Sequence, residues 1–189
     1  MKGYIYTMFE GADPGNGWEM TDPIFDVIPT MGACMPQIRR AVNVDDYIFT
    51  ISGRMKSLEQ YVVGGFQVKE KINALLAYDR FPEYRQTLHD DGSLSGNIIV
   101  DKNGNQNPYD YHKGDFEKRI QNYIIGKNPN YISDAEHIER ARGAASLGIL
   151  SDIFGKEGNK PHDIIGRWRK LDERQIDKML NWLDEIKVG

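Results

Sequence analysis

Cysteine is nearly absent from the sequence, and long hydrophobic runs are absent altogether. The single cysteine among 189 residues excludes an internal disulfide. No apolar run reaches the roughly 18 residues expected of a membrane-spanning helix, and no signal peptide is recognisable. The sequence therefore predicts a cytoplasmic protein that does not associate with a membrane.

Signatures of the common catalytic and cofactor sites are also missing. The sequence has no Walker A loop, no GxGxxG after a strand, no HExxH and no GxSxG. The four histidines are spread along the chain without the short paired spacings of a zinc site. We therefore expect no bound metal and no cofactor.

Neither sign of charge dominates the composition. The formal net charge is -4, whereas proteins that bind duplex DNA mainly through its phosphates usually have a strongly basic surface. A small ligand pocket fits this composition better than a long nucleic-acid groove. Apolar residues make up 40% and charged residues 28%, which is typical of a globular protein, and the length predicts a single domain over residues 1–189.

The residue patterning predicts an α+β fold. Strands are expected over residues 3–9, 45–53, 60–72, 97–100 and 121–128, which are rich in β-branched and aromatic side chains. A short helix is expected over 36–41, and a C-terminal amphipathic helix begins after Asp172, which forms a capping pair with Gln175. Short strands with long loops favour a small curved sheet or a barrel with peripheral helices.

Arg39 and Arg40 are the best candidates for binding a phosphate. Both follow Pro36 in the expected short helix, where backbone N–H groups and a guanidinium can converge on one anion. The alternative is that one arginine pairs with Asp45 or Asp46 and the other faces solvent.

Cys34 and Trp18 each allow two interpretations. We expect Cys34 to be a small packed residue, because no histidine is close to it in the sequence, although a thiol at a helix start can also act as a nucleophile. Trp18 lies in a glycine-rich loop, where it either stacks on a base or anchors the loop to the core.

Two further segments are candidates for a ligand site. Gly64 and Gly65 interrupt a strand, which indicates a bulge or a close approach to another strand or to a ligand. Glu70 follows in the same strand and is either a surface residue or a group that contacts a base edge. The amide-rich segment 96–112 contains His112 and forms either a hairpin or one wall of a pocket.

The order of these motifs resembles the nucleotide modification associated domain 2 family of bacteria and phages, over most of the chain. The matching residues are Asp13, Pro14, Cys34, Pro36, Ile38, Arg39, Arg40, Asp46, Gly96, Asn97, Ile98, Gln106 and His112. The chain departs from the family pattern at Asp45, where glycine is usual. The resemblance implies a link to DNA base modification and to conflict between phages and bacteria, including antiphage defence.

A weaker similarity is to the PUA-like barrels, which include the base-reading ASCH, EVE and YTH domains. It implies a pocket between the loop 13–18, the helix that carries Arg39 and the strand that carries Gly65. Such a pocket would take a free nucleotide or a base flipped out of a strand.

Three functional hypotheses follow. The first is a non-catalytic domain that binds a nucleotide, or a nucleic acid with a modified or flipped base. The second is an enzyme that transfers or hydrolyses a group on a nucleotide, with His112 or Glu70 as general base. The third is an interaction module for a protein partner. The expected ligand-binding residues are Asp13, Trp18, Cys34, Arg39, Arg40, Gly65, Glu70, Asn97, Gln106 and His112.

Overall fold

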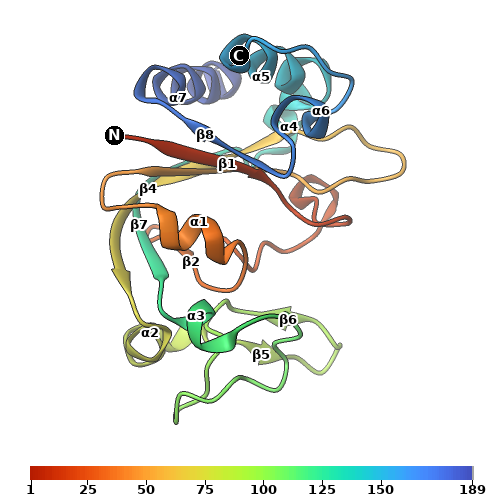
Figure 1. Ribbon diagram of the computed structural model, residues 1–189. Helices are drawn as coiled ribbons and strands as arrows, with labels where there is room; N and C mark the ends of the chain where they lie inside the picture. Colours follow the sequence, from red (N-terminus) through yellow and green to blue (C-terminus); the bar gives the residue numbers. More distant parts are fainter. Residues whose placement is uncertain (189) are drawn as a thin grey trace. The chain divides into compact units, whose positions relative to one another are not determined.

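The computed structural model describes residues 1–188 and confirms the α+β class (Figure 1). Its strands are β1 (Gly3–Thr7), β2 (Thr30–Met31), β3 (Tyr47–Ile51), β4 (Val62–Ile72), β5 (Thr87–Leu88), β6 (Leu94–Ser95), β7 (Tyr123–Tyr131) and β8 (Trp168–Leu171). Its helices are α1 (Pro36–Ala41), α2 (Ala74–Arg80), α3 (Phe116–Ile120), α4 (Ala135–Ala141), α5 (Ala144–Phe154), α6 (Pro161–Ile165) and α7 (Glu173–Val188), with short 3-10 turns η1 (Pro14–Asn16) and η2 (Pro82–Tyr84).

Six strands form a mixed sheet in the order β2-β7-β4-β3-β1-β8, and β5 pairs separately with β6. The strand order begins at β2 and ends at β8, so the described residues contain no closed barrel. The barrel that the PUA-like similarity implied is therefore not found. No helix within residues 1–188 is long and apolar enough to cross a membrane.

The chain divides into two compact units, each made of separate segments. The first unit comprises Met1–Glu19, Asp45–Gln67 and Asn128–Gly189, and the second comprises Met20–Val44 and Val68–Lys127. In the first unit, β1 runs parallel to β3 and antiparallel to β8, with Ile5 opposite both Phe49 and Arg169. Helices α4 to α7 lie together on one side of β1 and β8 (Figure 1).

The C-terminal helix α7 is confirmed with its predicted capping pair. The backbone N–H of Gln175 donates to the Asp172 carboxylate, and the N–H of Asp172 donates to the Gln175 side chain, both at 2.9 Å. The helix buries Ile176, Met179 and Leu183, whose spacing places them on one face. Local sequence therefore determines both where this helix begins and which face packs.

The second unit is built around the pairing of β2 with β7, in which Thr30 lies opposite Ile125. Its apolar core comprises Ala33, Ala74, Ala77, Phe81, Ile98, Ile99, Val100, Ile120, Tyr123 and Ile125. The prediction of a strand over 97–100 is wrong, because Ile98 and Val100 make only isolated bridges. These residues are buried apolar groups within an irregular loop, a pattern that resembles a strand in the sequence.

The glycine pair in β4 lies at a close approach between strands, and the register with β3 shifts beside it, between Thr50 and Ile51. A Cβ atom on Gly65 would lie 2.4 Å from the Phe49 ring, and one on Gly64 would lie 2.4 Å from the Asn130 carbonyl oxygen. Gly64 also has a φ of +142°, which side chains rarely adopt. These positions therefore accept only glycine without rearrangement.

We expect Gly65→Ala to lower the free energy of unfolding by about 1–3 kcal/mol, because the added methyl group overpacks the strand. The matched control is Gly148→Ala in α5, where a Cβ meets nothing within 4 Å and alanine favours the helix by about 0.5–1 kcal/mol. Urea denaturation of the two variants measures the difference. Equal stabilities would contradict the packing role of Gly65.

Candidate functional site

A buried carboxylate in the second unit holds the loop that leads into α1. Asp22 is 6% exposed and accepts hydrogen bonds from the backbone N–H groups of Gly32 at 2.8 Å and Ala33 at 3.1 Å, and from that of Cys34. The Asn97 side chain donates to the same carboxylate at 3.0 Å. These four donors fix the backbone on which Cys34 is placed.

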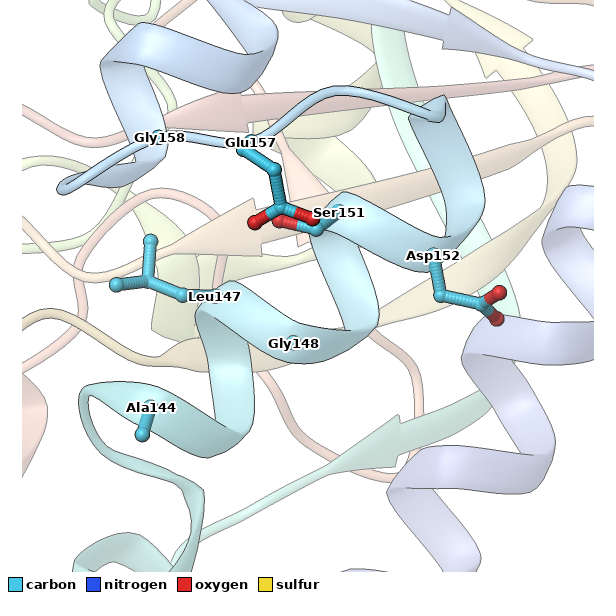
Figure 2. A pocket seen from close by; sticks show the side chains of 7 residues that line it. All are labelled: Ala144, Leu147, Gly148, Ser151, Asp152, Glu157 and Gly158. Carbon is cyan, nitrogen blue, oxygen red and sulfur yellow. The ribbon is translucent and has the colours of Figure 1, made fainter.

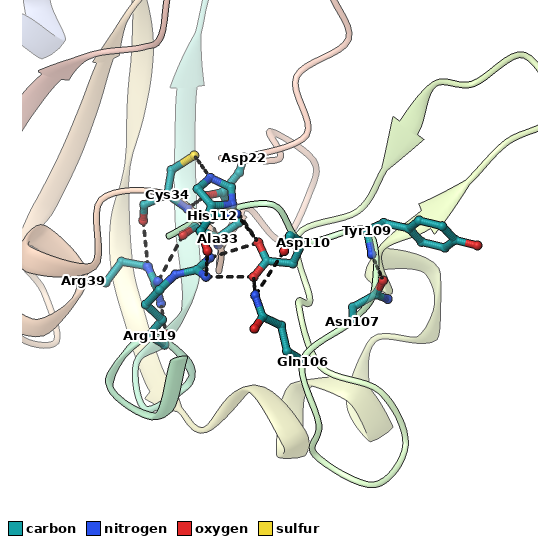
Figure 3. Close-up of polar contacts among 10 residues, drawn as sticks. All are labelled: Asp22, Ala33, Cys34, Arg39, Gln106, Asn107, Tyr109, Asp110, His112 and Arg119. Carbon is teal, nitrogen blue, oxygen red and sulfur yellow. Dashed lines mark hydrogen bonds and ion pairs between the residues drawn. The ribbon is translucent and has the colours of Figure 1, made fainter. Parts of the chain in front are cut away.

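Arg39 fixes the same loop from the other end. Its guanidinium is almost fully buried and donates to the carbonyl oxygens of Cys34 at 2.8 Å, Arg119 at 2.9 Å and Asn122 at 2.7 Å (Figure 3). A further contact at 3.4 Å reaches the Ala33 carbonyl. The side chain therefore joins the start of α1 to the end of α3.

Asp110 supports the loop that carries His112. Its buried carboxylate accepts from both Nη atoms of Arg119, at 2.8 and 3.1 Å, and from the Gln106 side chain at 2.8 Å. It also lies 2.7 Å from Nδ1 of His112. Asp110 thus fixes the imidazole while a two-pronged ion pair with Arg119 fixes Asp110 itself.

His112 and Cys34 meet in space although they are 78 positions apart in the sequence. The distance from His112 Nε2 to Cys34 Sγ is 3.7 Å (Figure 3). With the proton on Nδ1, where it is donated to Asp110, Nε2 is free to accept the thiol proton. Cysteine, histidine and aspartate therefore form the sequence of contacts that activates a nucleophile in many hydrolases and transferases.

The surroundings shift the pKa values of Asp110 and Cys34 in opposite directions. Burial by itself would raise the pKa of Asp110, but hydrogen bonds from His112 and Arg119 outweigh it and hold this pKa well below the usual range. Burial raises the pKa of the Cys34 thiol, and the negative charge of Asp22 adds to the rise while the Arg39 guanidinium opposes it. The resting thiol is therefore neutral.

Asp22 has a shifted pKa of its own. Burial raises it, and the backbone N–H groups of Cys34, Gly32 and Ala33 together with the positive charge of Arg39 counteract part of the rise. These partners satisfy the carboxylate from several sides, so Asp22 has the contacts of a group that shapes the loop.

Asn97 extends the polar network into the core. It is fully buried, donates to the Thr30 side chain at 3.1 Å and accepts from the Tyr123 hydroxyl at 2.8 Å. Because its amide is saturated by protein groups, its position is that of a structural residue. Gln106, through its contacts with Asp110, supports the site in the same way.

Three expected residues belong to the first unit, namely Asp13, Trp18 and Gly65, whose packing in β4 is described above. Asp13 is buried and makes a two-pronged ion pair with Arg142, at 2.8 and 3.0 Å, and its hydrogen bond raises the pKa of that guanidinium. Trp18 packs edge-on against the Phe9 ring, with 5.4 Å between ring centroids. Phe9 is itself 52% exposed, so this contact lies at the surface.

The remaining expected residues lie on the surface of the second unit. Glu70 accepts from Arg80 at 2.7 Å in an ion pair whose carboxylate is 40% exposed, and Arg40 is exposed beside the buried Arg39. Within residues 1–188, no hydrogen bond or ion pair joins either side chain to Cys34 or His112.

Sequence analysis missed three members of the site, namely Asp22, Asp110 and Arg119. Asp110 has a usable signal, since it stands two residues before His112 and carboxylates commonly orient an imidazole. Nothing in the sequence distinguishes Asp22 from other acidic loop residues, or Arg119 from other helical arginines. Their roles depend on contacts between segments that only folding brings together.

Two cavities in the first unit offer less chemistry. One, of about 510 Å³, lies along α5 and the loop that follows it (Figure 2). Its lining residues are Ala144, Leu147, Gly148, Ser151, Asp152, Glu157 and Gly158. This lining contains two carboxylates and no basic group, so it does not favour a phosphate. The second cavity, of about 150 Å³, includes Arg54 and Lys160.

No group of three or more histidine, cysteine or acidic side chains within residues 1–188 is arranged to hold a metal ion.

Comparison with known proteins places the chain in one family. The model of nucleotide modification associated domain 2 matches residues 18–189, and the chain belongs to that family. No curated protein and no solved structure matches it. Membership associates the chain with nucleotide modification, and the match includes Cys34, Asp110 and His112.

Proposed function

We propose that this member of the nucleotide modification associated domain 2 family is an enzyme in which Cys34 attacks a nucleotide or nucleobase substrate. His112 is the general base and Asp110 orients it. The observation that carries the proposal is the continuous contact from Cys34 Sγ to His112 Nε2, at 3.7 Å, and from His112 Nδ1 to Asp110, at 2.7 Å.

The proposed step is a group transfer in two halves. His112 Nε2 takes the thiol proton as Cys34 Sγ forms a bond to an electrophilic carbon of the substrate, and the bond from that carbon to its leaving group breaks with the proton returned from the imidazolium. A water molecule, deprotonated by His112, then attacks the same carbon. The carbon–sulfur bond breaks and the thiol is restored, so the net reaction is hydrolysis.

The neutral resting thiol determines the form of this mechanism. Burial holds the pKa of Cys34 above that of an ordinary thiol, so the proton leaves only as the bond to the substrate forms. In this respect Cys34 resembles an activated hydroxyl nucleophile more than a thiolate already paired with an imidazolium.

A second candidate function is binding of a nucleotide or modified base without chemistry. The packing of Cys34 against the buried Asp22 carboxylate favours it, because burial and that negative charge raise the pKa of the thiol, and a neutral thiol is a weak nucleophile. In that case His112 contributes polar contacts to the ligand and has no effect on the reactivity of Cys34.

Alkylation of Cys34 by iodoacetamide tests the proposal, since Cys34 is the only cysteine and intact mass reports its modification. We expect His112→Ala to slow alkylation at neutral pH by about tenfold. In the wild type the rate should keep rising with pH beyond the ordinary thiol pKa of 9.0, because the pKa of Cys34 is raised.

The matched control is His89→Ala, since His89 is exposed and its side chain contacts the Ser95 hydroxyl. The His89→Ala variant should be alkylated at the rate of the wild type. An alkylation rate that is the same with and without the His112 imidazole would refute the nucleophile. A plateau near neutral pH would instead indicate a thiolate–imidazolium pair and refute the neutral thiol.

A further inference from the structure

An exposed aromatic ring lies directly on the imidazole of the site. Tyr111 is 71% exposed, and its ring is stacked on that of His112 with 5.1 Å between centroids and 9° between planes. An exposed tyrosine loses little conformational freedom when it gains a partner, because it has only two side-chain torsions. One face of this ring is therefore held by His112 while most of the side chain remains accessible.

Other accessible aromatic side chains lack this position. Tyr109 is 42% exposed, but its ring points away from the cluster around His112 (Figure 3). Trp168 is 40% exposed and lies against Tyr4. Among the ring contacts described for residues 1–188, the Tyr111 contact is the one made with the imidazole that touches Cys34.

We infer that the outer face of Tyr111 stacks on a nucleobase of the substrate. The inference rests on the proposed function, because it uses His112 as the centre of the reaction. Aromatic rings bind bases in this way without sequence preference, since every base has a flat π-face. A base can reach an exposed ring only when it is outside a duplex stack, so the ligand is a free nucleotide or an unpaired base in a strand.

The stacked base is a binding contact and not the atom that Cys34 attacks. A base stacked on the outer face of Tyr111 is separated from the His112 imidazole by the Tyr111 ring. Cys34, in contrast, contacts the Nε2 edge of that imidazole. The reacting carbon therefore lies beyond the ring that stacks, either on another part of the same nucleotide or on a neighbouring nucleotide. Tyr111 accordingly selects substrates that carry a base next to the group transferred.

Binding measurements in the Cys34→Ser protein separate this inference from the chemistry. The probes are the common deoxynucleoside monophosphates and a short single-stranded DNA, with a strand of the same length that lacks bases as the negative ligand. We expect Tyr111→Ala to weaken binding of at least one base-containing probe by about 5- to 150-fold. Tyr111→Phe should bind normally, because phenylalanine keeps the ring.

Tyr109→Ala is the matched control and should bind like the parent protein. The single strand and the monophosphates distinguish the two sources of the base. Binding of either probe more tightly than the strand that lacks bases supports stacking. The inference is overturned if Tyr111→Ala binds as the parent does, if Tyr109→Ala loses as much, or if no base-containing probe binds. Should that happen while Cys34 alkylation still depends on His112, the proposed nucleophile stands and only the base contact fails.

Discussion

Replacing Arg39 with alanine should lower the free energy of unfolding by about 3–5 kcal/mol. The Arg39 guanidinium is 1% exposed and supplies donors to carbonyl oxygens in two segments, at Cys34 and at Asn122. Without it these buried oxygens lose their partners, and each such loss costs about 1–3 kcal/mol. Urea denaturation monitored by circular dichroism measures the change in unfolding free energy.

The neighbouring arginine provides the control for this prediction. Arg40 is exposed, so Arg40→Ala should change the unfolding free energy by less than about 0.5 kcal/mol. If Arg39→Ala were as stable as Arg40→Ala, the buried hydrogen bonds of Arg39 would not hold the loop together. The comparison also separates the two arginines, which are equivalent in the sequence pattern.

Asp110→Asn is expected to affect stability and reactivity together. Asparagine keeps the shape of the side chain but leaves the Arg119 guanidinium, which is 4% exposed, without its counter-charge. Leaving one partner of a buried ion pair uncompensated costs about 3–5 kcal/mol. The imidazole also loses the carboxylate that fixes its tautomer, so Cys34 alkylation should slow as it does in His112→Ala.

The stability effect of Asp110→Asn should depend on pH. The folded-state pKa of Asp110 lies below the ordinary aspartate value of 3.8, so the ionised carboxylate stabilises the fold at neutral pH. This contribution is lost as the pH falls from the ordinary value through the folded-state pKa. The difference in unfolding free energy between wild type and variant should therefore narrow below about pH 4.

Asp115→Asn is a suitable control for that titration. Asp115 is exposed, caps α3 and accepts from the Lys118 N–H at 3.2 Å. Asparagine is also a good N-cap, so Asp115→Asn should change the free energy of unfolding, and its dependence on pH, much less than Asp110→Asn does. A difference between Asp110→Asn and wild type that stayed constant from neutral to acidic pH would contradict the buried ion pair with Arg119.

The sequence indicated several residues of the site but not the contacts that they make. The family motif placed Cys34, Arg39, Asn97, Gln106 and His112 in one chain order, and the structure gathers the contacts of all five in the second unit. The structure adds their contacts: the Arg39 guanidinium donates to backbone carbonyl oxygens, and Cys34 lies against His112.

What the sequence by itself determined is the local structure. The capping pair of α7 and its apolar face are specified by residues a few positions apart, whose spacing decides where the helix begins and which face is buried. The same is true of α1, which begins at Pro36 and ends at Ala41 as expected.

Only the tertiary structure decided which polar groups meet. Cys34 and His112 are 78 positions apart, and Arg39 and Asn122 are 83 positions apart. Residue spacing carries no information about such pairs, because long irregular loops connect them and packing of the second unit's core fixes where those loops lie. A buried donor must find an acceptor on folding, but which acceptor it finds depends on the whole unit.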